Sequence, residues 1–474
     1  MGRKHIIGFA VFGVVVLGYF LFFSTPNTIT LTEHGFTPRE MTVSTGETVT
    51  FVNKRDKYFW PASDFHPTHA AYPEFDAQRA IAPGASWSFT FDEPGLYKYH
   101  DHLAPFFFGI VRVSDENGRV VDDCRERGGN LACWQDEIFI ALAEDGIDGA
   151  YDAVGELYET EPDFAQSCHF IAHNIGLASY GFYREDPTSI LSPKASACAS
   201  GFYHGFMEAY LGATGDVVQA GATCESIGES LKNEAPDARF QCYHGIGHGA
   251  VELLIAGTGV FGTLSEMVDE ALVQCERASD GDEERFRCAS GIFNGVANFY
   301  INEEYGLDVT TSNPLDLCAV QKERIYADAC YGNMNSVAYW MTGENFVESV
   351  ELTLRGAETR YATLAIEYLA GLHAFYKLPT YDRDTVVLEC RALGAYSIPC
   401  IVGFTHGLLE HGTPQREYED ALSFCAHTLL SSVEKDACYT EALSQLHGWY
   451  ASHTVTEICS SLPVSLQAYC PKEE

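Results

Sequence analysis

The chain has 474 residues and a formal net charge of −37, from 29 Lys and Arg against 66 Asp and Glu. Its hydrophobic and charged fractions, 46% and 20%, are those of a globular protein and exclude a disordered chain. Because such an acidic surface repels polyanions, we expect no nucleic-acid partner. The length allows two or three domains with substantial cores.

The N-terminus has the pattern of a membrane anchor. Residues 6–23 are an unbroken run of 18 apolar or glycine residues that follows Arg3 and Lys4. At ~1.5 Å per residue this run spans ~27 Å as a helix, about the hydrocarbon thickness of a bilayer, and the basic flank favours a cytoplasmic tip. A cleaved signal peptide is the alternative, although no small-x-small cleavage pattern follows. We predict a cytoplasmic tip and transmembrane anchor over residues 1–25, with the body on the extracytoplasmic side.

Residues 26–115 form the second predicted domain. Short alternating stretches are separated by the turn signals Thr45-Gly46, Pro83-Gly84 and Pro94-Gly95. The predicted strands cover residues 29–32, 41–43, 48–52, 87–91, 97–99 and 110–113. About 85 residues of this kind predict an antiparallel β-sandwich.

Several motifs of this domain resemble the cupredoxin family, the plastocyanin-like blue-copper proteins, in order and spacing. They are Gly35-Phe36-Thr37-Pro38, Thr45-Gly46-Glu47-Thr48-Val49-Thr50-Phe51-Val52-Asn53, Ala82-Pro83-Gly84, Glu93-Pro94-Gly95-Leu96-Tyr97-Lys98-Tyr99-His100 and Gly109-Ile110-Val111-Arg112-Val113. The resemblance covers residues 28–113 and implies a sandwich with metal-ligand loops.

The same resemblance argues against a blue site. The family's cysteine, second histidine and methionine ligands fall on Asp101, Ala104 and Phe107. No cysteine occurs before residue 114, and the blue colour and redox tuning of such sites depend on the thiolate.

Four histidines offer a different ligand set. His100 and His102 lie two apart directly after the predicted strand 97–99, and if the extended backbone continues through them, both can face one metal while Asp101 faces away. His66 and His69 lie in a turn-rich loop around a proline. Four imidazoles suit copper, with zinc as the alternative, because raw affinity favours copper. The competing interpretation is a sandwich whose histidines are only polar loop residues.

Three carboxylates near these histidines are candidates to orient a ligand ring. They are Glu74, Asp76 and Asp101. A metal-bound imidazole usually donates its second ring N–H to a carboxylate or carbonyl, and the sequence does not choose among the three.

Residues 116–474 are predicted to be a cysteine-rich, acidic, all-α domain. A motif Cys-x-x-Gly-x-x-His/Asn-Gly begins at Cys198, Cys242, Cys288 and Cys400. Its starts recur roughly every forty residues, with one wider gap, which is the period of helix-pair repeats. We expect an array of helical hairpins that could curve around a concave, partner-binding face.

All 16 cysteines of the chain lie in this third domain. In an exported protein they indicate disulfides, each joining a helix-ending cysteine to the next helix-opening one. The predicted pairs are Cys124–Cys133, Cys168–Cys198, Cys224–Cys242, Cys275–Cys288, Cys318–Cys330, Cys390–Cys400, Cys425–Cys438 and Cys459–Cys470. Closing such loops stabilises a fold by ~2–4 kcal/mol each on the chain-entropy estimate.

The repeated motif also carries glycines and histidines. Its glycines share one helical face, where a neighbouring helix can approach closely. Three histidines are followed four residues later by glutamate, as in His204/Glu208, His248/Glu252 and His406/Glu410, and such pairs share a helical face. Packing hydrogen bonds would explain these histidines, and a second metal or catalytic centre is the alternative. Its candidate residues are His173, His204, His248, Glu252 and His406.

Three functions fit these observations. The first is a membrane-anchored, extracytoplasmic copper-binding protein whose helical array docks a protein partner, in electron transfer or copper handling. The second is a copper-dependent oxidoreductase with a second centre on the helical histidines. The third is a surface interaction protein without metal chemistry, because repeat arrays usually bind macromolecules.

Overall fold

A computed structural model of the chain describes residues 27–64, 66, 69, 71–120, 124–161, 163–258, 263–302, 307, 315–357, 359–378 and 380–472. The predicted anchor at residues 6–23 lies outside these ranges. None of the helices within them is long and apolar enough to cross a bilayer.

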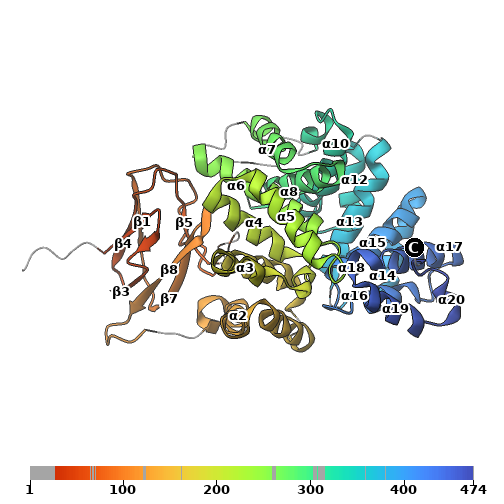
Figure 1. Cartoon of the computed structure of the whole chain (residues 1–474), viewed down its shortest axis with the longest axis horizontal. Coiled ribbons are helices and arrows are strands. Elements are labelled where there is room, and N and C mark those ends of the chain that lie inside the picture. The colour runs from red at the N-terminus through yellow and green to blue at the C-terminus, as the bar shows by residue number, and fades with distance from the viewer. Residues whose placement is uncertain are drawn as a thin grey trace, which may run out of the picture.

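The N-terminal part is a β-sandwich, as the alternating pattern predicts (Figure 1). One sheet has the strand order β2-β1-β4-β6 and the other β3-β8-β7-β5. The strands are β1 (Thr28–Thr32), β2 (Gly35–Thr37), β3 (Glu40–Ser44), β4 (Thr48–Asn53), β5 (Pro61–Ser63), β6 (Ser86–Thr90), β7 (Gly95–Asp101) and β8 (Ala104–Ser114). Every second residue of β4 is buried, so one face of its sheet packs on the other sheet.

The expectation of purely antiparallel sheets is wrong for two strand pairs. β1 runs parallel to β4, and β3 runs parallel to β8. β1 and β4 are separated along the chain by β3, which belongs to the other sheet. A strand that is reached by crossing between sheets is free to pair in parallel, whereas a tight hairpin forces antiparallel pairing.

The regular secondary structure of the rest of the described chain is helical. Their bounds are α2 (Cys124–Thr160), α3 (Ala165–Glu185), α4 (Gly201–Thr214), α5 (Val217–Leu231), α6 (Ala238–Thr258), α7 (Leu264–Ala278), α8 (Asp282–Ile301), α9 (Asp316–Ala319), α10 (Arg324–Asn333), α11 (Asn335–Met341), α12 (Phe346–Gly356), α13 (Ala362–Lys377), α14 (Arg383–Ala392), α15 (Ser397–His411), α16 (Glu417–Cys425), α17 (Ser432–Ser444), α18 (Leu446–Trp449), α19 (Ser452–Ser461) and α20 (Val464–Gln467).

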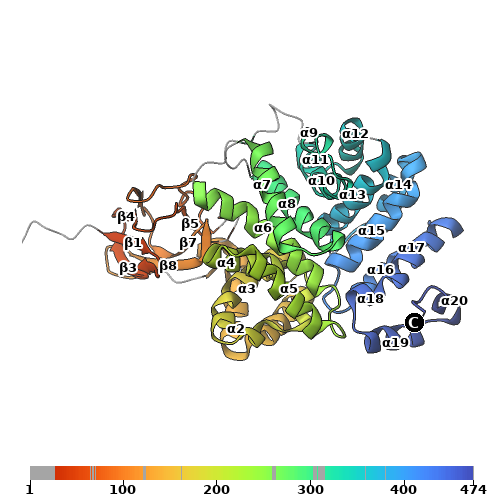
Figure 2. The ribbon, with the colours of Figure 1, turned by 45° about the horizontal axis from the view of Figure 1, so that its top comes forward.

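Helices α4, α6, α8 and α15, which carry the repeated motif, belong to a continuous row of packed helices. α3, α4, α6, α8 and α10 each pack on the next, and α13, α15 and α17 continue the row (Figure 2). The array also curves back on itself. The Tyr158 hydroxyl donates to the His411 carbonyl (2.9 Å), and Arg416 pairs with Glu159 at 2.9 Å. The end of α15 therefore touches the end of α2.

Disulfides join the successive helices of this array. The bonded pairs are Cys168–Cys198, Cys224–Cys242, Cys275–Cys288, Cys318–Cys330, Cys390–Cys400, Cys425–Cys438 and Cys459–Cys470. These are the pairs that the loop spacing predicts. Cys133 is also disulfide-bonded, and the side chain of its predicted partner Cys124 lies outside the described residues. A domain with so many disulfides is typical of an oxidising, extracytoplasmic compartment.

The glycines of the repeated motif lie at helix crossings. A Cβ on Gly205 would overlap the carbonyl oxygen of His173, and one on Gly245 would overlap that of Tyr203. A Cβ on Gly291 would overlap the carbonyl oxygen of His244 in the same way. The prediction of close helix approach is confirmed, and this approach brings the motif histidines of neighbouring helices together.

The sandwich meets the helical domain at the end of its β3-β8-β7-β5 sheet. β8 packs on α3 and α4, and Figures 1 and 2 both show β8 beside these helices. Lys98 of β7 forms an ion pair with Asp136 of α2, and the Tyr58 N–H donates to the Ala256 carbonyl of α6. The loops that carry the four sandwich histidines therefore lie against helices.

Candidate metal centre

The four sandwich histidines converge at this end of the sheet. His100 is the penultimate residue of β7, beside Ala62 of β5. His66 and His69 follow β5 in the next loop. The strand prediction for His102 is wrong, because β7 ends at Asp101 and His102 lies in the turn before β8. The His102 N–H donates to the Trp60 carbonyl at 2.7 Å, which fixes this turn.

The ring nitrogens of these histidines have the spacing of metal ligands. His66 Nδ1 lies 3.3 Å from His100 Nε2, and His69 Nε2 lies 3.0 Å from His102 Nδ1. One nitrogen from each ring fits in a group whose members all lie within 4.8 Å of one another. Two nitrogens bound tetrahedrally to one ion at 2.0–2.1 Å are about 3.3 Å apart. The four side chains can thus reach a single ion with little movement.

Burial keeps two of these imidazoles neutral. The four residues are only 1–5% exposed. Burial lowers the pKa of His100 to about 4, and burial together with the neighbouring imidazoles lowers the pKa of His102 well below its usual value. At neutral pH both rings therefore present a lone pair and need lose no proton to bind a metal.

Asp76 orients the ring of His69. Its Oδ2 lies 2.8 Å from His69 Nδ1, and its Oδ1 accepts from Trp60 Nε1. Burial alone would favour the neutral acid, but the hydrogen bonds from His69 and Trp60 hold the pKa of Asp76 below its usual value. This carboxylate uses His69 Nδ1 and leaves Nε2 directed at His102, the arrangement of a carboxylate–histidine–metal unit.

The other two predicted carboxylates have different places. Asp101 is fully buried, accepts the Trp60 N–H at 2.8 Å and pairs with Arg55 at 3.2 Å, so it holds the turn rather than a ligand ring. Glu74 is exposed. Asp64, which the sequence analysis did not single out, lies 3.6 Å from the otherwise unpartnered His100 Nδ1.

Replacing Asp76 by asparagine should weaken metal binding by about 10–100-fold, the usual effect of losing a carboxylate that orients a ligand. The amide keeps the shape of the side chain but removes the charge that fixes the His69 tautomer. Competition titration of copper against a chelator measures this change. Glu74→Gln, which alters an exposed carboxylate two residues away, is the control and should bind as the wild type does. Equal affinity for both variants would contradict the role of Asp76.

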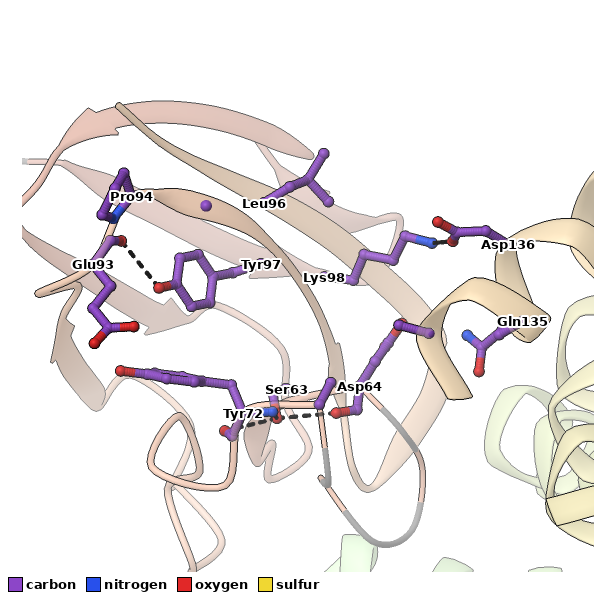
Figure 3. A pocket seen from close by; sticks show the side chains of 13 residues that line it. Ser63, Asp64, Tyr72, Glu93, Pro94, Leu96, Tyr97, Lys98, Gln135 and Asp136 are labelled. Atoms are coloured by element: carbon purple, nitrogen blue, oxygen red, sulfur yellow. Dashed lines mark hydrogen bonds and ion pairs between the residues drawn. The ribbon is translucent and has the colours of Figure 1, made fainter. Parts of the chain in front are cut away.

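A pocket of about 600 Å³ adjoins this centre between β7 and α2 (Figure 3). Asp64 lines it, together with Tyr72, Tyr97, Lys98 and Gln135. The Lys98–Asp136 ion pair crosses one side of the pocket, as Figure 3 shows. Asp64 is also the near neighbour of His100, so one residue of the pocket wall lies beside the histidine cluster, although none of the four histidines lines the pocket.

Two glutamates of the helical domain face His66 from the other side. His66 Nε2 lies 3.4 Å from Glu252 of α6 and 3.6 Å from Glu208 of α4. Glu208 also contacts His173 Nε2 at 2.9 Å and His248 Nδ1 at 3.5 Å. His66, Glu208 and Glu252 form a second group with metal-ligand spacing.

These carboxylates change the protonation of His66. Burial alone disfavours its imidazolium, but hydrogen bonds to Glu208 and Glu252 raise the pKa of His66 to about 10. Burial beside Glu208 raises the pKa of Glu252 to about 7. Without a metal, His66 therefore carries the proton that a metal ion would displace.

A third group lies deeper in the helical domain. His204 of α4 and His244 and His248 of α6 present ring nitrogens that all lie within 4.8 Å of one another. His244 Nε2 and His248 Nε2 are 3.3 Å apart. Burial lowers the pKa of His248 to about 4, and burial next to the other rings lowers those of His204 and His244 well below their usual value.

The predicted second-site residues divide into two sets. His173, His204, His248 and Glu252 lie in, or next to, the second and third groups, which Glu208 links by its contacts with His173 and His248. His406 does not, because it pairs with Glu441 at 2.9 Å and its ring meets that of Trp449 edge-on. Glu208 and Glu252 contact imidazoles of neighbouring helices and of the sandwich loop, whereas Glu410 lies 3.7 Å from the next residue, His411. His244, which the candidate set omitted, stands at the second position after Cys242 in a motif copy.

No family model matches the chain, and no curated protein matches it. Similar solved structures include a purple cupredoxin from Nitrosopumilus maritimus, with 22% identity over 18% of this chain and 98% of that chain and a TM-score of 0.17. A Cu(I) structure of a mutant amicyanin has 22% identity over 20% of this chain and 87% of that chain, with a TM-score of 0.17. The likeness is confined to a segment about as long as the sandwich, and the metal-site assignment rests on the side chains described above.

Proposed function

We propose that this chain is an extracytoplasmic copper-binding protein in which His66, His69, His100 and His102 hold one copper ion. The observation that carries the proposal is the convergence of four buried imidazoles, whose ring nitrogens lie within 4.8 Å of one another and include one pair at 3.3 Å and one at 3.0 Å. A single metal ion can engage one deprotonated nitrogen from each of the four rings.

The donor set favours copper, with zinc as the competing ion. Imidazole suits both, and the intrinsic affinity order of nitrogen sites places Cu(II) above Zn(II). All described cysteines belong to the helical domain and are disulfide-bonded. The copper would therefore be nitrogen-ligated and would lack the intense colour of a thiolate site.

The role that fits this centre is electron transfer or copper handling. Four imidazoles fill a tetrahedral coordination shell and leave no open position for a substrate. The helical domain covers the ligand loops and supplies Glu208 and Glu252 beside His66. Tethering by an N-terminal transmembrane helix and docking of a protein partner on the helical array complete the proposal.

Copper reconstitution of the full chain tests this function. Electron paramagnetic resonance should show a Cu(II) signal with nitrogen hyperfine structure, and the visible spectrum should lack an intense blue band. Failure to bind copper would overturn the proposal, and an intense blue band would overturn the ligand assignment.

A further inference from the structure

We propose that the helical domain holds a second transition-metal ion, bound by His204, His244 and His248. None of these residues belongs to the four-histidine site of the sandwich. The two sites can therefore be loaded, removed and tested separately.

The close packing of α4 and α6 builds this site. A Cβ on Gly245 would overlap the Tyr203 carbonyl, so the two helix backbones touch next to His204 and His244. The ring centroid of His204 lies 4.6 Å from that of His244 and 4.9 Å from that of His248. His244 and His248 are one helical turn apart on α6 and direct Nε2 at each other at 3.3 Å. Nitrogens at this separation fit one metal ion.

His204 supplies the independent indication that a ligand belongs here. It is 5% exposed, and neither of its ring nitrogens has a hydrogen-bond partner among the described residues. An imidazole held only for packing usually satisfies at least its N–H, because burying an unpaired polar group is unfavourable. A metal ion would engage one of these two unpartnered nitrogens.

The carboxylate of Glu208 lies behind the ring of His248. Its Oε1 lies 3.5 Å from His248 Nδ1, on the opposite side of the ring from the nitrogen that faces His244. A carboxylate behind a ligand ring fixes its tautomer and increases its basicity. The Glu208 side chain is 3% exposed, so its charge is poorly screened by solvent.

The chemistry of the three donor side chains restricts which metal ions can bind. Three neutral imidazoles suit copper or zinc, and three protein ligands leave a coordination position open. The sandwich site, in contrast, has a fourth imidazole. Glu208 also contacts His66, so one carboxylate lies between the two histidine groups.

Metal counting on the full chain tests the second site. The metal-free protein is loaded with Cu(II), passed over a desalting column and analysed by elemental analysis. We expect two equivalents in the wild type, one in His244→Ala/His248→Ala, one in His100→Ala/His102→Ala and none when all four are replaced. His447→Ala/His453→Ala, which removes two exposed histidines of the same domain, should retain both equivalents.

A second measurement guards against misfolding of the alanine variants. His244→Gln alters only the half-buried member of the triad, and it should keep the wild-type circular dichroism spectrum while binding the second equivalent at least tenfold more weakly. Wild-type metal content in both the His244→Gln and His244→Ala/His248→Ala variants would overturn the proposal. If the sandwich site fails instead, the wild type holds one equivalent that the helical variants lose, and the result stays distinct.

Discussion

Replacing His100 and His102 together by alanine should abolish copper binding at the sandwich. His100 lies just before the end of β7 and His102 just after it, and together they supply two of the four imidazoles. Two remaining histidines cannot complete a tetrahedral shell, and the loss of two ligands should weaken binding by more than the ~10–100-fold expected for an orienting carboxylate. The full chain should lose one equivalent of copper together with the nitrogen-ligated resonance signal.

The matched control for this variant is His34→Ala. His34 is an exposed histidine of the same sandwich and lies outside the histidine groups described above. It should keep the wild-type copper content and spectrum. If the His100→Ala/His102→Ala protein folds and keeps both, the copper is bound elsewhere and the four-histidine assignment is wrong.

Replacing Gly205 by alanine should destabilise the helical domain more than any exposed substitution. The new methyl group would overlap the His173 carbonyl oxygen and push α3 away from α4. Overpacking usually costs ~1–3 kcal/mol, and a clash with backbone falls at or above the upper end because no side chain can swing away. Urea denaturation followed by circular dichroism measures the change in the free energy of unfolding.

Gly181→Ala is the control for this prediction. Gly181 lies in α3 at an exposed position where a Cβ would meet nothing within 4 Å. Alanine there should stabilise the helix by ~0.5–1 kcal/mol, because glycine loses more conformational freedom on folding. Similar unfolding curves for the two variants would show that close approach at Gly205 is not required. The Gly205 variant should also bind the second metal more weakly, since α4 carries His204 and Glu208.

Local patterns predicted much of the fold. Alternation and turn residues located the longer strands of the sandwich, and the repeated Cys-x-x-Gly motif predicted both the disulfide pairs and the helix crossings. These features depend on residues close in sequence, where periodicity and loop length constrain the structure directly. β5 was missed because Pro61-Ala62-Ser63 is short and begins with a residue that disfavours strands.

The contacts around the site could not be predicted from the sequence, because they join residues that are far apart along the chain. The sequence grouped His66, His69, His100 and His102, but nothing local indicates that Glu208 and Glu252 face His66 across the interface. The i, i+4 spacing suggested that Glu208 contacts His204. In the structure, close helix packing places Glu208 against His173 and His248 instead. Side chains on one helical face compete with those of neighbouring helices, and sequence spacing does not weigh that competition.

The four-histidine copper site is tested most directly by X-ray absorption at the copper K-edge. The His244→Ala/His248→Ala chain loaded with one equivalent of copper isolates the sandwich site. We expect about four nitrogen neighbours near 2.0 Å, with the outer-shell scattering of imidazole rings and no sulfur neighbour. A sulfur neighbour, or a first shell of oxygen without imidazole scattering, would contradict the assignment of His66, His69, His100 and His102 as the ligands.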